Sequence, residues 1–133
     1  MFKPLRTAAA LPAQDMARAK AFYRDKLGLT PTVEDPGGMM YALAAGTGFG
    51  VFPSSGKPSG THTQMGIEVE DVEAAVKDLQ AKGVKFEEYD TPGLKTVNGI
   101  AELGGSKVAW FKDSEGNLIA LGLPVPAFSP VRA

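Results

Sequence analysis

The 133-residue chain contains no cysteine. This absence excludes disulfide bonds, thiolate nucleophiles and metal sites built on cysteine, and it suits a reducing compartment. Long hydrophobic runs are also missing, because no stretch approaches the ~20 apolar residues that span a bilayer. Small residues at 8–13 resemble a cleavage site, but Lys3, Pro4 and Arg6 interrupt the apolar stretch before them, which argues against a signal peptide. We therefore expect a cytoplasmic protein.

An excess of charge of either sign is lacking as well. The sequence carries 14 Lys and Arg against 15 Asp and Glu, a formal net charge of −1. A nearly neutral chain gives no basis for electrostatic binding to nucleic acid or to an anionic membrane, so neither is expected as a partner. Apolar residues make up 44% of the chain, which is ordinary for a globular protein and sufficient for the core of one domain.

The sequence does contain a diverged internal duplication. Asp15 and Asp71 each stand where a helix N-cap is expected, and apolar residues follow each of them at helical spacing. Each helical segment ends at a glycine, Gly28 or Gly83, which suits the left-handed position after a helix. The pattern predicts two helices at equivalent places in two successive halves.

Strand-like segments surround each predicted helix. One precedes each helix, and further ones follow it: 5–11, 29–34, 39–44 and 48–53 in the first half, and 63–69, 84–89, 99–103, 106–112 and 117–122 in the second. The second half has one run more than the first, so 99–103 either forms a strand or extends a neighbouring one. We predict an α+β fold of two tandem βαβββ modules, forming an open cup-shaped mixed sheet with the helices on its outer face.

Composition sets the expected boundaries within this single domain. Module one covers residues 4–53, a Ser/Gly-rich linker covers 54–62, module two covers 63–122 and a Pro-rich tail covers 123–133.

Two segments carry a resemblance to a known family. One is the first helix with its exit, Asp15–Leu29 (DMARAKAFYRDKLGL); the other is Phe111–Asn117 (FKDSEGN), a turn in which Ser114 replaces the family's usual proline; Ile67–Val72 fits as well. These segments resemble the vicinal oxygen chelate superfamily, which includes glyoxalase I, bleomycin-resistance proteins, fosfomycin-resistance enzymes and extradiol dioxygenases. The resemblance covers about residues 5–122. It implies the fold and leaves the activity open, because fold does not fix function.

The resemblance also implies where a metal would bind. Metal enzymes of this family gather His, Gln or Glu ligands from inward-facing strand positions, two from each module. Carried over by spacing, these positions fall on Ala8, Gln64 and Ala120, and residues 44–53 include no Asp, Glu, His or Gln. A divalent ion needs several converging N or O donors. We therefore expect no metal and no other cofactor.

Three polar side chains near the start of module two are candidates for a site. His62, Gln64 and Glu68 share one parity, so they face inward together if the strand begins as early as His62. His62 or Glu68 would then be a general base, or His62 a polar anchor for a ligand. The alternative for His62 is a solvated histidine in the linker.

Aromatic residues are the other candidates. The resemblance places Trp110 facing the cup, where its ring would stack on a planar ligand. The alternative is packing of Trp110 in the core or at a dimer interface. Tyr41 and Phe49 are strand residues of module one that either line the opposite wall or belong to the core.

The leading hypothesis is a metal-independent bacterial protein that binds a small organic molecule, such as an antibiotic or a metabolite, and sequesters it as a homodimer. A second hypothesis is an enzyme of the family. It would be a metal-free isomerase, cyclase or lyase with His62, Glu68 or Glu102 as its base, or else a metal-dependent glyoxalase or dioxygenase. A third hypothesis is a structural or regulatory dimer without a ligand.

Overall fold

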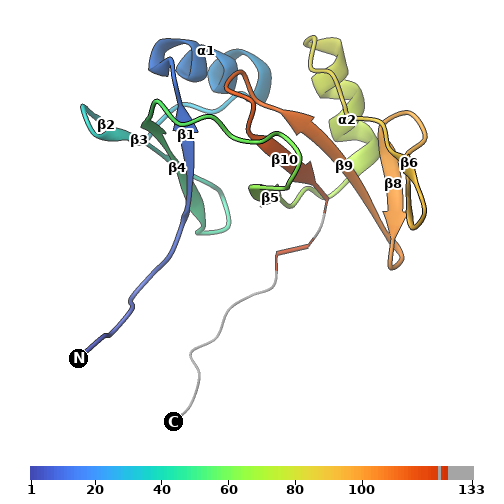
Figure 1. Cartoon of the computed structure of the whole chain (residues 1–133), viewed down its shortest axis with the longest axis horizontal. Coiled ribbons are helices and arrows are strands. Elements are labelled where there is room, and N and C mark those ends of the chain that lie inside the picture. Colours follow the sequence, from blue (N-terminus) through green and yellow to red (C-terminus); the bar gives the residue numbers. More distant parts are fainter. Residues whose placement is uncertain (123, 126–133) are drawn as a thin grey trace.

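The computed structural model describes residues 1–122 and 124–125. The chain forms two successive units, each with one helix and a four-stranded sheet (Figure 1). The helices α1 and α2 lie on the same side of the molecule, above the sheets in the figure. The expected tail, 123–133, lies outside the described residues except for Pro124 and Val125.

Module one contains one helix and four strands: β1 (Ala9–Ala13), α1 (Met16–Leu27), β2 (Val33–Asp35), β3 (Gly38–Ala42) and β4 (Gly48–Pro53). The strand order is β1-β4-β3-β2, with β1 parallel to β4 and the other pairs antiparallel. Because β1 is an edge strand of its sheet, a proline at position 12 is tolerated within it.

Module two repeats this arrangement with β5 (Met65–Ile67), α2 (Val72–Ala81), β8 (Ile100–Leu103), β9 (Ser106–Lys112) and β10 (Leu118–Leu121). The strand order is β5-β10-β9-β8, again with the first strand parallel to the last. The predicted α+β fold of tandem modules with open sheets is confirmed. Module two also has a short hairpin, β6 (Asp90–Thr91) and β7 (Leu94–Lys95), which module one lacks.

The ends of both helices follow from the residues predicted to cap them. The side chain of Asp15 accepts a hydrogen bond from the backbone N–H of Arg18, and Asp71 does the same for Ala74. Gly28 ends α1 with a φ of 69°, and Gly83 follows α2 with a φ of 90°. A side chain at these left-handed positions would be strained, which is why glycine stands at both.

The predicted strand 84–89 is wrong. Phe86 forms only an isolated bridge to Phe111, and the N–H of Glu87 donates to the carbonyl of Trp110. β8 pairs only with residues 106–109 of β9. Only residues 110–112 of β9 are left on that edge, too few to pair with a strand as long as 84–89. The segment around Phe86 occupies the remaining edge of β9, and the chain then leaves the sheet for the β6–β7 hairpin.

The first strand of each module begins later than predicted. β1 starts at Ala9 rather than at residue 5, and β5 starts at Met65 rather than at 63. A strand requires a partner, and their partner strands offer paired residues only from Phe49 and Ile119 onward. Residues 5–8 are therefore extended chain without a ladder.

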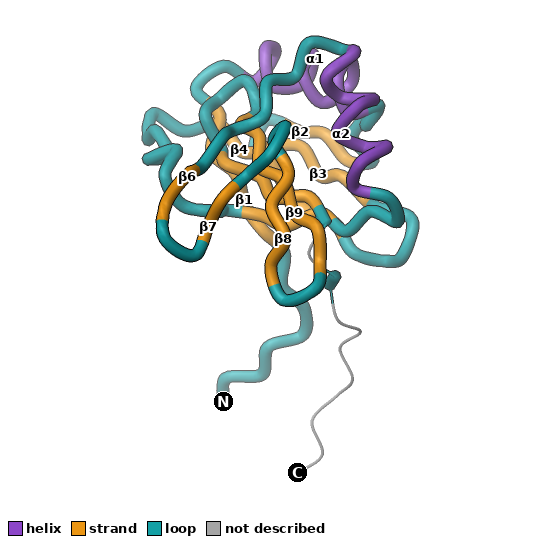
Figure 2. Tube along the Cα trace, turned by 90° about the vertical axis from the view of Figure 1, so that its right-hand side faces the viewer, coloured by secondary structure: helices purple, strands orange, loops and turns teal. Residues whose placement is uncertain are grey.

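One hydrophobic core joins the two modules. It contains the helix-facing residues of both sheets and the buried faces of both helices. Tyr23 of α1 is fully buried in this core, with its ring 5.3 Å from that of Tyr41 and 5.5 Å from that of Phe49. Figure 2 shows the two helices together along one side of the strands. The opposite side of both sheets is the open face.

A buried turn after β9, residues 113–117, connects the modules through polar contacts and is called the clasp below. Asp113 accepts hydrogen bonds from the backbone N–H groups of Glu115 and Asn117 and, at 2.7 Å, from the hydroxyl of Tyr23. Asn117 donates to the carbonyl of Pro12 at 3.0 Å. Burial, and then the neighbouring Asp113 carboxylate, raise the pKa of Tyr23 far above its ordinary value. These contacts attach the clasp to β1 and α1.

Glu115 of the clasp holds the beginning of α1. Its carboxylate accepts from the backbone N–H groups of Gln14 and Asp15, both at 3.0 Å. Arg18 donates to both carboxylate oxygens, at 2.7 and 3.0 Å. A buried carboxylate with a bidentate arginine is a strong, directional contact.

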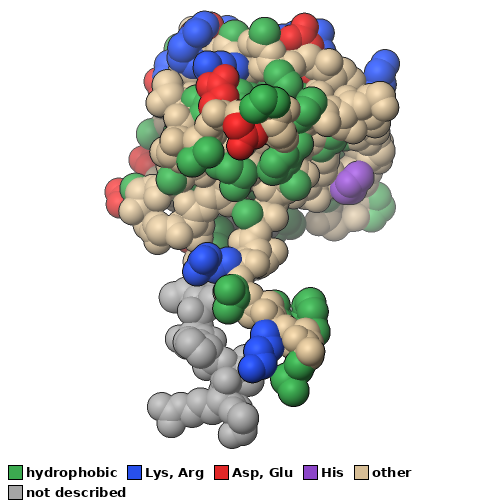
Figure 3. Space-filling view, turned by 90° about the vertical axis from the view of Figure 1, so that its left-hand side faces the viewer, with side chains coloured by type: hydrophobic (Ala, Val, Ile, Leu, Met, Phe, Trp, Pro, Cys, Tyr) green, Lys and Arg blue, Asp and Glu red, His purple; other side chains and the backbone are tan. Residues whose placement is uncertain are grey.

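The N-terminal segment projects away from the body of the molecule (Figure 3). Met1, Phe2 and Leu5 in this segment are among the most exposed large apolar side chains of the described residues. In the part of the chain that the structure describes, neither helix has the length and apolar character to cross a membrane.

Candidate binding face

The register of module two decides which side chains share its open face. Ala120 lies opposite Trp110 on β9 and opposite Gly66 on β5. Directly opposed residues point to the same side of a sheet, and their neighbours along the strand point to the other. The neighbours Phe111, Ile119 and Met65 belong to the core, so Trp110, Ala120 and Gly66 face the open side.

Trp110 sits within a second hydrophobic cluster on this face. The buried members are Ala101, Val108, Trp110, Leu118 and Ala120, and Tyr89, Leu94 and Leu103 pack against them. The Tyr89 ring stands edge-on to Trp110, with centroids 5.5 Å apart and planes at 88°. Burial of the Tyr89 hydroxyl, and the nearby Glu87, raise the pKa of Tyr89. Trp110 is only 8% exposed, and its indole N–H donates to the hydroxyl of Thr63 at 3.0 Å.

The open face is uncovered beside this cluster. A Cβ atom added at Gly66 would meet no heavy atom within 4 Å, so there is free space above β5. On module one, Ala10 and Ala42 are exposed on the same side of their sheet, and Met40 and Phe52 are half-buried there. A Cβ atom at Gly50 would lie 2.5 Å from the Phe52 ring and 2.8 Å from the Met40 sulfur, so these two side chains lie directly over that glycine.

The four strands β1, β4, β5 and β10 carry no polar side chain. β1 reads AALPA, β4 reads GFGVFP, β5 reads MGI and β10 reads LIAL. These strands are the first and last of each module, and they adjoin one another within each sheet. This part of the open face is therefore apolar; it includes the Phe52 ring of β4 and adjoins Trp110 on β9.

Tyr41 and Phe49 do not line this face. Both are fully buried on the helix side of β3 and β4, with their rings stacked 4.9 Å apart. Because alternate residues of a strand point to opposite sides, Met40 and Phe52 lie on the open side of β3 and β4 instead. Met40 and Phe52 were not predicted from the sequence, because no residue of β3 or β4 was known in advance to face the core. The contacts of Tyr23 with Tyr41 and Phe49 show which side of these strands faces the core.

The donors present do not fit the metal site that the resemblance implied. Ala120 faces the open side, and Ala8 precedes β1 with the same parity as Ala10; neither has a donor atom in its side chain. Gln64 uses its amide N–H to bind the side chain of Asn117 at 3.0 Å. In residues 1–122 and 124–125, no group of three or more His, Asp or Glu side chains is placed to hold a metal.

The three candidate bases lie on separate elements. His62 is exposed in the linker, outside any strand, and its Nδ1 lies 2.7 Å from the hydroxyl of Ser59. The condition for an inward-facing His62 is not met, because β5 begins only at Met65, and His62 has the exposed linker position that was the stated alternative. Glu68 follows β5 and accepts a hydrogen bond from the backbone N–H of Val125. Glu102 lies opposite Lys107 on the helix side of β8, so the fold does not bring the three together.

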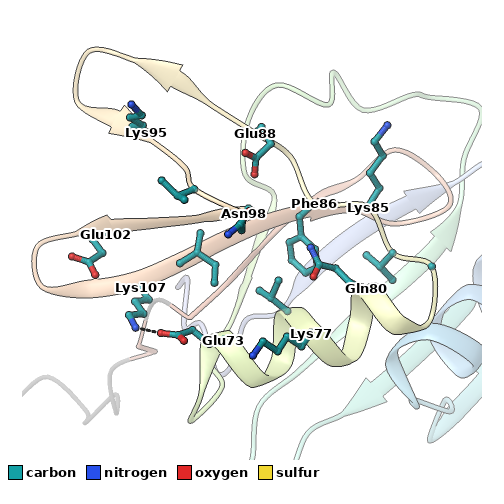
Figure 4. A pocket seen from close by; sticks show the side chains of 16 residues that line it. Glu73, Lys77, Gln80, Lys85, Phe86, Glu88, Lys95, Asn98, Glu102 and Lys107 are labelled. Atoms are coloured by element: carbon teal, nitrogen blue, oxygen red, sulfur yellow. Dashed lines mark hydrogen bonds and ion pairs between the residues drawn. The ribbon is translucent and has the colours of Figure 1, made fainter.

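A groove of about 1260 Å³ lies elsewhere, on the helix side between α2, the 83–99 segment and β8 (Figure 4). Phe86 and Ile100 are among its lining residues, together with charged residues of both signs. Glu73 and Lys107 form an ion pair across one end. Because its charges are mixed and dispersed, the groove does not indicate a particular ligand chemistry.

Solved structures show the same fold. A glyoxalase/bleomycin resistance protein/dioxygenase from Nocardioides has a TM-score of 0.68 and 19% identity, covering 100% of this chain and 91% of that one. TnmS3, an antibiotic binding protein from Streptomyces sp. CB03234, has a TM-score of 0.62 and 22% identity, covering 93% and 100%. The fosfomycin resistance protein FosX from Listeria monocytogenes has a TM-score of 0.65 and 16% identity, covering 94% and 96%.

At such identities these similarities concern the fold alone. Among curated proteins, none matches the sequence. The family model of the Glyoxalase/Bleomycin resistance protein/Dioxygenase superfamily, however, matches residues 6–121. That match covers nearly all of both modules, including the clasp and the strands β1, β4, β5 and β10. By its sequence and by its duplicated fold, the chain belongs to the glyoxalase/bleomycin resistance protein/dioxygenase superfamily.

Proposed function

We propose that the protein binds a small, largely apolar organic molecule on its open face and sequesters it, without a metal and without chemical change. An antibiotic or a metabolite of the cell is the expected ligand, and the cytoplasm is the expected place of action. The observation that carries the proposal is the composition of β1, β4, β5 and β10, which together contain no polar side chain.

An apolar centre favours binding over catalysis for a physical reason. General acid–base chemistry needs a titratable group within hydrogen-bond reach of the reacting atoms, and metal chemistry needs converging donors. Burial of an apolar ligand against Phe52, Met40 and the strands around Gly66 needs neither of these and releases water from both surfaces. One structural relative, TnmS3, is described as an antibiotic binding protein, which agrees with this kind of function.

Gly66 offers a direct test. Gly66→Leu adds a side chain above β5 whose Cβ would meet no heavy atom within 4 Å, so we expect the fold to persist and the ligand to be excluded. The probe is 8-anilinonaphthalene-1-sulfonate, and its emission is excited by energy transfer from Trp110, the only tryptophan. Ala17→Leu, on the exposed side of α1, is the size-matched control.

We expect the wild type and Ala17→Leu to bind the dye alike and Gly66→Leu to bind it at least about tenfold more weakly, as expected for a blocked pocket. Candidate antibiotics are then assayed by competition, and mass spectrometry of the recovered compound should show it unchanged. Equal dye binding by Gly66→Leu would refute the location, and a modified compound would refute sequestration.

We also propose that two chains pair. Phe2 is 89% exposed and Leu5 is 84% exposed on the projecting N-terminal segment, and such side chains favour burial against a partner surface. Sedimentation velocity should show a dimer that Phe2→Ser with Leu5→Ser weakens, whereas Val33→Ser, at a site that is also exposed, should not weaken it. A monomer at all concentrations would refute this proposal.

A further inference from the structure

The open faces of the two modules differ at Met40 and Trp110, which lie at equivalent positions of β3 and β9. Met40 is half-buried, whereas Trp110 is buried. Tyr89 and Leu94 pack against the cluster that contains Trp110. Both of these covering residues flank or belong to the β6–β7 hairpin, the element that module one lacks. We call residues 88–96 the flap.

The flap is fastened to itself rather than to the sheet. At its base, the N–H of Thr96 donates to the carbonyl of Tyr89 at 2.9 Å, and the N–H of Tyr89 donates to the Thr96 hydroxyl at 2.8 Å. Within the described residues, no hydrogen bond of 88–96 reaches β8, β9 or β10. Side-chain packing of Tyr89 and Leu94 therefore holds the flap against the sheet.

Both ends of the flap are anchored and adjoin points where the chain can turn. Before it, the N–H of Glu87 donates to the carbonyl of Trp110 at 2.8 Å. After it, Val97 and Ile100 exchange two backbone hydrogen bonds around the Asn98–Gly99 turn. In Figure 2 the hairpin is a separate two-stranded ribbon beside β8 and β9. A segment closed on itself between two anchors can move as a unit without breaking the sheet.

We propose that the flap is a lid on the binding face and that Tyr89 occupies the place of an aromatic ring of the ligand. This inference rests on the proposed function and specifies the ligand class as molecules with a planar aromatic ring. When the flap opens, Trp110 loses its perpendicular neighbour, and its ring becomes an accessible apolar surface beside the free space above Gly66. Aromatic rings pair favourably with such a surface, so the ligand's ring replaces the contact that Tyr89 gives up.

The first test needs no ligand. Trp110 is the only tryptophan, so its quenching by acrylamide reports access to that ring alone. We expect Tyr89→Ala to raise the quenching constant severalfold and to move the emission to longer wavelength. Tyr89→Phe keeps the ring and should match the wild type. Unchanged quenching in Tyr89→Ala, with the far-UV circular dichroism of a folded chain, would overturn the inference whatever ligand is bound.

The second test uses 8-anilinonaphthalene-1-sulfonate as the aromatic probe and decanoate as a probe without a ring. If the lid is open about a tenth of the time, removing its closing contact strengthens apparent affinity about tenfold. We expect this gain for the dye in Tyr89→Ala, no gain in Tyr89→Phe and none for decanoate. Equal dye affinity in all three proteins would overturn the lid, whereas the Gly66→Leu result decides the location of binding separately.

Discussion

Substitution of Glu115 by glutamine tests the contact that holds the two modules together. The Glu115 side chain has no exposed surface, and its carboxylate pairs with Arg18 at 2.7 Å. The two hydrogen bonds from the Arg18 guanidinium, helped by the Asp15 N–H and the Ser114 hydroxyl, lower the pKa of Glu115 from 4.5 to about 2. Glutamine keeps the shape and an acceptor oxygen but removes the charge.

The pKa shift sets the size of the effect. At about 1.4 kcal/mol for each pH unit, it corresponds to about 3 kcal/mol of folding free energy. Because the Arg18 side chain is 54% exposed, screening by water reduces this, and we expect Glu115→Gln to lose about 2 kcal/mol at pH 7. Because the pKa of Glu115 is lower in the folded than in the unfolded state, its carboxylate stabilises the folded state fully at pH values above 4.5. The contribution is lost as the pH falls from 4.5 toward 2.

Urea unfolding at pH 7, 5 and 3, followed by Trp110 fluorescence and by circular dichroism, measures this contribution. The deficit of Glu115→Gln should be full at pH 7 and 5 and should fall below about half of that at pH 3. Asp25→Asn is the control, because the Arg24–Asp25 pair is exposed on both sides and should contribute little at any pH. A deficit that persists undiminished at pH 3, or no deficit at pH 7, would refute the assignment.

Three further predictions concern the clasp, a helix cap and the open face. Tyr23→Phe should cost about 1–3 kcal/mol in urea unfolding because it removes a donor to the buried Asp113 carboxylate, whereas Tyr41→Phe, whose hydroxyl meets only a methionine sulfur at 3.8 Å, should cost less; equal losses would contradict this. Asp71→Ala should cost about 1 kcal/mol through loss of the α2 N-cap, with Asp78→Ala as the exposed control, and an equal effect of both would remove the capping argument. Zinc, nickel, manganese and iron(II) should leave the melting temperature unchanged, because the described part of the open face lacks converging donors that could bind them. A metal that binds only the folded state raises the melting temperature, so a rise of several degrees would show that a metal site exists.

The elements that the sequence predicted well are those defined by local chemistry. Asp15, Asp71 and the glycines after each helix have roles that depend only on their neighbours along the chain, so both helices end where predicted. β4 and β9 were also predicted with their observed bounds, because turns with glycine delimit them. The clasp turn was predicted from its residues and from the resemblance. Its contacts with Tyr23 and Arg18 could not be read from the sequence, since they join residues about 90–100 positions apart.

The candidate site was predicted in part because strand facing is a tertiary property. A shift of one residue moves a side chain to the other face of a sheet. The sequence therefore left Tyr41 and Phe49 open between the wall of the cup and the core, and the structure places both in the core. Tyr89 was missed because it was placed in a strand that does not form. The pattern around Asn98–Gly99, a favoured two-residue hairpin turn, was the available signal that the chain folds back there. Alternation did place Gly66 on the side of β5 opposite to Met65 and Ile67, which belong to or pack on the core.

The independence of the two sheets has a consequence for how this chain can be rearranged. Within the described residues, all strand pairs lie inside one module or the other, and the connection from Pro53 to Met65 runs as an exposed loop between them. The start of β1 and the end of β10 lie on the same side of the molecule, away from the helices (Figure 1). A circular permutant opened near Lys57, with the old ends joined by a flexible bridge, would thus preserve both ladders and the clasp. The folded state therefore does not require that module one precede module two along the polypeptide.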